Sequence, residues 1–151
     1  MGLFFTETGK AARKSKPKAQ SRRVIPILYY KSLSCAQCPL DKAQLQHPKI
    51  KPTGADNPII YLLGEAPGRN EDEQGIQFIG ASGQFLRDKI PVKWQKKIRW
   101  NNVVRCRTPG NRYPEALEIA CCKNLQVSDI EKSKPLVVAG FGNAPLEWCL
   151  G

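Results

Sequence analysis

Long apolar runs and acidic residues are scarce in this sequence. No segment approaches the ~18 uncharged apolar residues that cross a bilayer, and the amino-terminus lacks the continuous apolar core of a secretory signal. We therefore expect a soluble, cytoplasmic protein with no membrane span. The 151 residues allow only about one domain, which excludes a multidomain machine.

Positive charge dominates, because only 13 Asp and Glu stand against 24 Lys and Arg, for a net charge of +11. Such an excess predicts a polyanionic partner, most often a nucleic acid and less often an anionic membrane. Residues 1–23 carry seven Lys or Arg and one acid, Glu7. We expect a flexible basic arm over 1–23, either a solubilising tail or an arm that contacts phosphates, and a folded domain over 24–151.

Strand-like and helix-like segments alternate through the body of the chain, and 41% hydrophobic residues suffice for a sizeable core. The expected elements are strand 57–63, helix 82–90 capped by Ser82, strand 100–106, a helix with Pro114 in its first turn that ends before Pro135, strand 136–141, and a last helical turn from Gly142. This order predicts an α/β fold, a three-layer α/β/α sandwich around a central parallel sheet. A ligand site would lie at the carboxyl ends of the strands.

Because we expect a reducing compartment, we interpret the six cysteines as candidate metal ligands rather than as a disulfide framework, with scattered buried cysteines as the alternative. Cys35 and Cys38 form a C-x2-C pair, Cys106 ends a predicted strand, and Cys121 and Cys122 lie on the next predicted helix. Four thiolates from such positions can converge on tetrahedral zinc or on an iron-sulfur cluster, and spacing does not choose between them. We assign Cys149 to packing.

Three loops near strand ends are candidates for ligand contact. The turn GEAPGRNED at 64–72 would expose backbone N–H groups, although it is neither a Walker loop nor G-x-G-x-x-G. A glycine-rich stretch at 75–83 places Phe78 between flexible segments. The third loop, 101–112, combines asparagines with three arginines whose planar guanidinium groups match phosphate oxygens.

Together these segments resemble the iron-sulfur branch (family 4) of the uracil-DNA glycosylase superfamily, from Cys35 to Gly151. The resembling motifs are Cys35 to Leu40, GEAPG at 64–68 with Glu71 and Asp72, the stretch 75–83 (similar to G-x-P-F-V-G-x-S-G), NVVRC at 102–106, GNRYP at 110–114, Glu118-Ile119, and Cys122 to Leu125. The opening residues Met-Gly-Leu-Phe-Phe are similar to those of phage-borne members.

The resemblance implies a uracil-DNA glycosylase of base-excision repair that hydrolyses the N-glycosidic bond of a flipped-out uracil in DNA. It implies a 4Fe-4S cluster on Cys35, Cys38, Cys106 and Cys122, with Cys122 selected over Cys121 by the family's spacing.

The resemblance also implies the substrate site. Gly64, Glu65 and Ala66 would face the uracil, Phe78 would stack on it, and Asn102 would read its amide edge, with Asn101 as the rival. Glu65 would be catalytic, positioning water or stabilising the cationic sugar, and Glu71 is a secondary candidate for that role.

The chain departs from the family pattern in three places. Gln77 and Thr108 stand where prolines are usual, and both changes look tolerable. The family continues to a fourth strand and a His-Pro-Ser-type loop, whereas the only histidine here, His47, precedes the first strand and is expected at the surface. We therefore expect a C-terminally truncated domain with its last strand missing, an unpaired edge at 136–141, and catalysis slowed by about 10²- to 10³-fold.

Three functional hypotheses follow. The first is the glycosylase, a monomer or a chain completed by a partner chain. The second is a catalytically inactive iron-sulfur remnant that still binds DNA. The third is membrane attachment through the M-G-x-x-x-[ST] match at Gly2, which we disfavour because so short a motif arises by chance.

Overall fold

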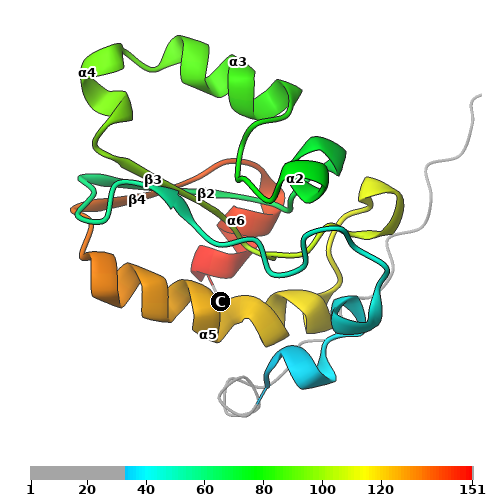
Figure 1. The fold of residues 1–151 in the computed structure, drawn as a ribbon. Coiled ribbons are helices and arrows are strands. Elements are labelled where there is room, and N and C mark those ends of the chain that lie inside the picture. Colours follow the sequence, from blue (N-terminus) through cyan, green and yellow to red (C-terminus); the bar gives the residue numbers. More distant parts are fainter. Residues whose placement is uncertain (1–32, 151) are drawn as a thin grey trace, which may run out of the picture.

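The computed structural model describes residues 33–150. The predictions for the basic arm 1–23 and for Gly2 lie outside these described residues. Figure 1 shows a central sheet with helices on both faces, which confirms the predicted three-layer α/β fold. The sheet has the order β1-β3-β2-β4 and is formed by β1 (Thr53–Gly54), β2 (Ile60–Gly64), β3 (Ile98–Asn102) and β4 (Val137–Gly140).

The three strands β2, β3 and β4 are parallel to one another, as predicted. β2 lies in the middle, with Gly64 opposite Asn102 of β3 and Leu63 opposite Gly140 of β4. The short β1 pairs antiparallel with β3 and was not predicted, because two residues carry no readable periodicity. The crossovers between the parallel strands contain helices, so the sheet is covered on both sides.

Two helical layers enclose the sheet (Figure 1). On one side lie α2 (Arg69–Gln74), α3 (Ala81–Lys89) and α4 (Val92–Gln95), and on the other lie α5 (Ala116–Ser133) and α6 (Asn143–Leu150). Three short 3-10 helices complete the described part of the chain, namely η1 (Cys35–Gln37), η2 (Pro39–Lys42) and η3 (Pro109–Asn111).

Alternation along β2 divides the core between these layers. Tyr61 and Leu63 point toward α5 and α6, where they pack with Ala144. Leu62 points the other way and packs with Trp100 against the α3 side. Because successive side chains of a strand face opposite sides, one apolar run serves both interfaces.

Several predicted boundaries were wrong by a few residues. The second long strand is 98–102 rather than 100–106, and residues 103–106 leave the sheet toward the cysteines. Ser82 does not cap α3, since Gly80 occupies the N-cap position. Pro114 precedes α5 instead of lying in its first turn, because Glu115 is the N-cap. The α5 cap is local, because the Glu115 N–H donates to the Glu118 carboxylate, and the Gly80 N–H at the α3 cap donates to Glu71.

The outer side of β4 is apolar and exposed. Within residues 33–150 β4 pairs only with β2, and Leu136 and Val137 are 80% and 52% exposed. This arrangement matches the expected unpaired edge at 136–141. None of the described helices combines the length and apolarity needed to span a membrane.

A partly buried ion pair fastens α5 to the sheet. Asp129 on α5 accepts from Arg99 Nε and Nη2 and from the Tyr61 hydroxyl, each at 2.8 Å. The Tyr61 hydroxyl also accepts a hydrogen bond from Asn101 Nδ2. Burial alone raises the pKa of the Asp129 carboxyl, but the hydrogen bonds from Arg99 and Tyr61 outweigh burial and hold its pKa below the ordinary value.

We predict that Asp129→Asn lowers the free energy of unfolding by about 3 kcal/mol near pH 7, because it leaves the Arg99 guanidinium with only the exposed carboxylate of Asp56, at 3.3 Å, as counter-charge. Since the folded pKa of Asp129 is depressed, its stabilisation is complete above pH ~4 and is lost as the pH falls through that folded pKa. The gap between wild type and variant should therefore shrink on acidification. Denaturant unfolding against pH measures it, with the exposed Asp88→Asn as control. A gap that stays constant down to pH 2 would contradict this assignment.

Candidate functional site

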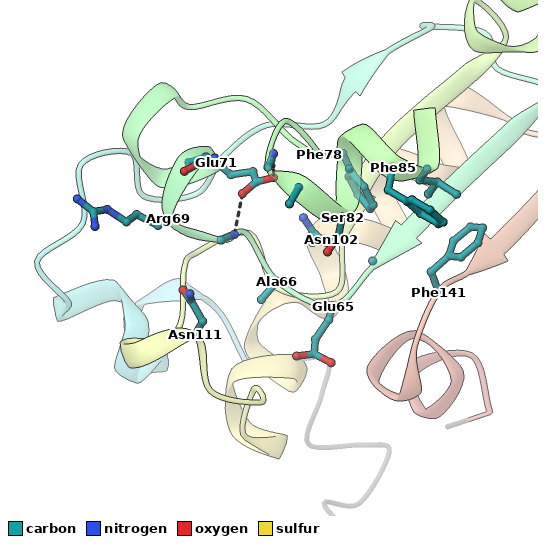
Figure 2. Close-up of a pocket in the computed structure, with 17 residues that line it drawn as sticks. Glu65, Ala66, Arg69, Glu71, Phe78, Ser82, Phe85, Asn102, Asn111 and Phe141 are labelled. Atoms are coloured by element: carbon teal, nitrogen blue, oxygen red, sulfur yellow. Dashed lines mark hydrogen bonds between the residues drawn. The ribbon is translucent and has the colours of Figure 1, made fainter. Parts of the chain in front are cut away.

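A pocket opens at the carboxyl ends of the parallel strands, where the fold class places ligands. Its volume is about 680 Å³, within the range of small-molecule sites. Gly64 ends β2, Asn102 ends β3 and Phe141 follows β4, and all three line the pocket. In Figure 2, Phe78, Phe85 and Phe141 lie on one side and Arg69 and Asn111 on the other. The pocket thus has an aromatic wall and a polar wall.

The floor of the pocket is shaped by the missing side chain of Gly64. A Cβ at this position would lie 2.5 Å from Phe78 Cζ and would also collide with Asn102 Oδ1. The glycine therefore leaves room for the Phe78 ring and the Asn102 amide to approach the same strand end. A flat group entering the pocket would meet an aromatic face and a hydrogen-bonding edge together.

Phe78 is held in an unusual backbone conformation. Its φ of 57° is rare for a bulky residue and is retained only where the surroundings impose it. Gly83 supplies one constraint, because a Cβ there would lie 2.6 Å from the Phe78 Cα. Arg87 supplies another by donating from Nε to the Phe78 carbonyl at 3.2 Å. The ring itself packs against Trp100, with 5.3 Å between centroids.

Glu71 ties together the two glycine-rich loops that frame the pocket. Its carboxylate is buried and accepts from the backbone N–H of Gly68 at 3.1 Å and from that of Gly80 at 2.7 Å (dashed in Figure 2). Both of its oxygens are therefore engaged by the protein backbone. Glu71 therefore positions both loops, and its secondary catalytic part stays a prediction from the sequence.

Glu65 and Ala66 form the turn beyond the floor. The carbonyls of Gly64 and Glu65 accept from the N–H groups of Val103 and Val104, which fixes the turn to the residues after β3. Glu65 is half-buried and lines the pocket, and no other described side chain pairs with its carboxylate. It is thus the acid in this pocket that is available to a ligand.

The two adjacent asparagines are separated by strand alternation. Asn102 faces the pocket, whereas Asn101 is buried on the opposite face of the sheet and donates to the Tyr61 hydroxyl at 2.7 Å. The geometry therefore favours Asn102 over its rival.

The arginines of the loop 101–112 all have partners within the protein. Arg112 makes a two-pronged contact with the buried Glu118, at 2.9 and 2.6 Å. Arg105 donates to the Leu125 carbonyl, and Arg107 donates to Asn111. Arg105 and Arg112 thus hold the loop against α5, and Arg107 braces the loop internally.

Five of the cysteines lie where η1 approaches α5. Cys38, Cys106 and Cys121 share one buried cluster with Leu33, Leu40 and Ala120. Cys122 is also buried, Cys35 is half-buried, and Cys149 is exposed on α6. Within residues 33–150, no three His, Cys, Asp or Glu side chains have the arrangement of a single-ion site.

The thiols differ in their backbone partners. The N–H of Lys49 donates to Cys106 Sγ at 3.3 Å, and that of Arg105 donates to the Cys122 sulfur. Burial raises the pKa of Cys122 to about 12, an effect that the Arg105 N–H reduces and the thiols of Cys106, Cys35 and Cys38 increase. Cys121 instead shares a hydrogen bond with Cys38, and burial raises its pKa to about 11. Cys38, Cys106 and Cys122 thus each receive backbone N–H donors, which are typical of sulfur that carries negative charge.

Some residues of the site could not be recognised from sequence. Phe85 and Phe141 were read only as apolar positions of a helix and a strand, and Gln77 only as a departure from a motif. A signal existed for Phe141, since it follows a predicted parallel strand at its carboxyl end. His47 lies at the surface as predicted, and its Nδ1 lies 2.7 Å from the Asp72 carbonyl.

A family model for the uracil DNA glycosylase superfamily matches residues 51–151, which include the whole pocket. The chain belongs to the uracil DNA glycosylase superfamily. This confirms the resemblance carried by the motifs between Cys35 and Gly151.

Curated relatives agree with this membership. A type-4 uracil-DNA glycosylase of Archaeoglobus fulgidus is 32% identical over 112 residues, 73% of this chain and 55% of the relative. The Sulfurisphaera tokodaii protein of that name is 34% identical over 113 residues, 73% of this chain and 50% of the relative. The Thermotoga maritima protein of that name is 30% identical over 116 residues, which are 76% of this chain and 59% of the relative. The chain thus spans about half the length of the relatives it matches.

We predict that Glu71→Ala lowers the free energy of unfolding of this superfamily member by about 2 kcal/mol, because two backbone donors lose a charged acceptor. Hydrogen exchange should accelerate at the Gly68 and Gly80 amides. Glu73→Ala on the same helix is the control, since Glu73 is exposed and its pair with Arg69 is worth under ~1 kcal/mol. Unchanged hydrogen exchange at the Gly80 amide in Glu71→Ala would show that the Glu71 carboxylate does not hold the two loops.

Proposed function

We propose that this chain excises uracil from DNA by hydrolysing the N-glycosidic bond of a flipped-out nucleotide. The observation that carries the proposal is the juxtaposition at Gly64, where an aromatic ring and a buried amide meet at a site a Cβ would fill. A base-excising enzyme must take the base out of the stack and read its edge in a pocket of this kind. The names of the relatives point to the same reaction.

Each pocket residue has a part in that reaction. Phe78 stacks on the extruded base, and Asn102 offers an acceptor and a donor to the N3–H and O4 of uracil. Bond cleavage leaves positive charge on the sugar and negative charge on the departing base. The Glu65 carboxylate stabilises the sugar cation or orients the water whose oxygen bonds to C1′, while the base leaves with the bonding electrons and takes up the proton that the water gives up. Ala66 and Gly64 keep the turn close to the base.

A 4Fe-4S cluster on Cys35, Cys38, Cys106 and Cys122 is the second part of the proposal. The donor set fits, because cysteine thiolates are the usual ligands of such clusters, Cys38 and Cys106 lie among apolar side chains, and Cys38, Cys106 and Cys122 receive backbone N–H donors. The cluster would be structural, joining η1, the segment after β3, and α5. Cys121 stays outside the ligand set, packed beside Cys38.

DNA is the proposed partner, and the basic arm 1–23 adds electrostatic attraction that needs no fixed structure. Binding should therefore weaken steeply with salt. We propose that the folded domain is 24–151 and acts as a monomer in the cytoplasm. A second chain that completes the sheet beside β4 is the alternative arrangement.

The proposed reaction predicts release of free uracil from a uracil-containing oligonucleotide. Glu65→Ala should slow release by about 10²-fold, because it removes the acid next to the reacting sugar. Asn102→Ala should slow it by a similar factor, because the base loses its oriented polar partner. Glu131→Ala, an exposed glutamate on α5 outside the pocket, is the matched control. Chromatography of the released base measures the rate.

Two results would go against this reaction. Release that is unaffected by Glu65→Ala and Asn102→Ala would place the chemistry elsewhere. Salt-dependent DNA binding without any release by the wild type would favour the inactive DNA-binding remnant instead.

The proposed cluster predicts about four irons per chain and broad visible absorbance in anaerobically purified protein. The adjacent pair Cys121 and Cys122 gives a matched test. Cys122→Ala should lose iron and colour, whereas Cys121→Ala and Cys149→Ala should keep both. A colourless, zinc-containing protein would overturn the iron assignment. Loss of iron in Cys121→Ala but not in Cys122→Ala would show that Cys121, rather than Cys122, is the fourth ligand.

A further inference from the structure

Gln77 is fully buried and connects two segments that are distant in sequence. Its Nε2 donates to the backbone carbonyl of Ile50 at 3.1 Å, and its Oε1 accepts from Asn102 Nδ2 at 2.5 Å. Ile50 and Asn102 are also buried, so water does not compete for these groups. A glutamine amide that is completely enclosed and bonded at both ends has one defined orientation.

The Ile50 carbonyl sets the donor and acceptor directions in this hydrogen-bonded chain from Ile50 through Gln77 to Asn102. A backbone carbonyl can only accept, so Gln77 must turn its NH₂ toward Ile50 and its oxygen toward Asn102. That oxygen can only accept in turn, so Asn102 must present its NH₂ to Gln77. The Asn102 oxygen is therefore directed away from Gln77. Ile50 itself is anchored, because its N–H donates to the Arg105 carbonyl at 2.9 Å.

The free oxygen of Asn102 lies at the pocket floor. Asn102 Oδ1 is the first atom that a Cβ on Gly64 would meet, and both residues line the pocket. In Figure 2 the oxygen end of the Asn102 amide lies on the side of Glu65 and Ala66, and its nitrogen end turns the other way. One N–H of the amide is used by Gln77, which leaves one acceptor and one donor for a ligand.

We propose that Gln77 is a positioning residue that makes the pocket select a base with a donor at N3, uracil, over a base with an acceptor there, cytosine. The inference rests on the proposed function and adds the origin of its specificity. With Oδ1 fixed toward the base, uracil N3–H donates to it and O4 accepts from the remaining N–H. Cytosine would set its N3 lone pair against Oδ1 and its 4-amino group against that N–H. Both contacts would then be buried and unmatched.

Loss of the Gln77 oxygen would release the Asn102 amide. Rotation by half a turn exchanges its oxygen and nitrogen, and the rotated amide suits cytosine as well as the original suits uracil. Phe78, Gly64 and Glu65 do not distinguish the two bases by polarity. The preference for uracil over cytosine therefore depends on the hydrogen bonds that join Ile50, Gln77 and Asn102, and not on the identity of Asn102 alone.

The test compares base preference in Gln77→Met, which keeps the length of the side chain and removes both hydrogen bonds. Dissociation constants for free uracil and free cytosine, from NMR titration, give a readout independent of catalysis, and base release from deoxyuridine and deoxycytidine oligonucleotides gives a second. We expect the uracil-to-cytosine preference to fall at least about 10-fold. Gln84→Met is the matched control, since Gln84 also donates to a loop carbonyl, that of Ile79, but is exposed and does not line the pocket.

Gln77→Glu separates orientation from packing. Its carboxylate still accepts from the Asn102 NH₂ but cannot donate to Ile50 unless it is protonated. We expect this variant to be less stable than Gln77→Met yet to keep the preference for uracil. If Gln77 acted only through packing, the more stable Gln77→Met would keep the preference for uracil better than Gln77→Glu. The comparison of the two variants is therefore informative even where one of them folds poorly.

The outcomes distinguish the inference from the proposed function. A wild-type preference for uracil that persists in Gln77→Met overturns the inference and leaves the function intact. A wild type that neither binds uracil preferentially nor releases it overturns the proposed function, and the inference with it. Loss of preference in Gln77→Met with retention in Gln77→Glu and Gln84→Met supports both.

Discussion

The pocket depends on a close approach that only glycine permits at the end of β2. Gly64 lies where the Phe78 ring and the Asn102 amide come together, and any larger residue would separate them. The strand backbone at this point is the meeting place of two chain segments that are far apart in sequence. Because the neighbours are a rigid ring and a hydrogen-bonded amide, neither can yield without loss of its own contacts.

The other contacts of the site hold that approach in place. Glu71 fastens the loops of Gly68 and Gly80, Arg87 and Gly83 hold Phe78 in its left-handed conformation, and Gln77 orients Asn102. A site of this kind is organised before the ligand arrives, so binding does not have to order its polar groups. The buried charge of Glu71 and the unusual φ of Phe78 each carry a cost that the surrounding contacts must offset.

The sheet provides the frame on which these loops are placed. Parallel pairing of β2 with β3 and β4 brings the three carboxyl ends to one edge, and the Asp129 network fixes α5 to the opposite face from α3. The exposed apolar residues of β4 contrast with the buried residues of β2, although both strands have the continuous hydrophobic pattern of an interior parallel strand. Position in the sheet, rather than composition, distinguishes them.

Sequence patterns predicted the parallel strands and the longer helices within a few residues, because apolar periodicity and proline are local signals. They missed β1, α2 and α4, which are too short to show a period, and misplaced the caps of α3 and α5. The family resemblance predicted which residues line the pocket, and in the structure strand alternation places Asn102 at the pocket and Asn101 on the opposite face of the sheet. Phosphate contact by the arginine loop stays a prediction, and the structure adds that Arg112 also engages the buried Glu118.

The sequence by itself therefore determined the α/β class, the family, the strand ends that meet at the pocket, and the cysteines available as ligands. These properties follow from hydrophobic spacing and from motifs whose residues are close in the chain. Only the tertiary structure decided which donors and acceptors meet. The direction of the Asn102 amide and the place of Gln77 between Ile50 and the pocket both depend on hydrogen bonds between distant segments, which act over about 3 Å and leave no period in the sequence.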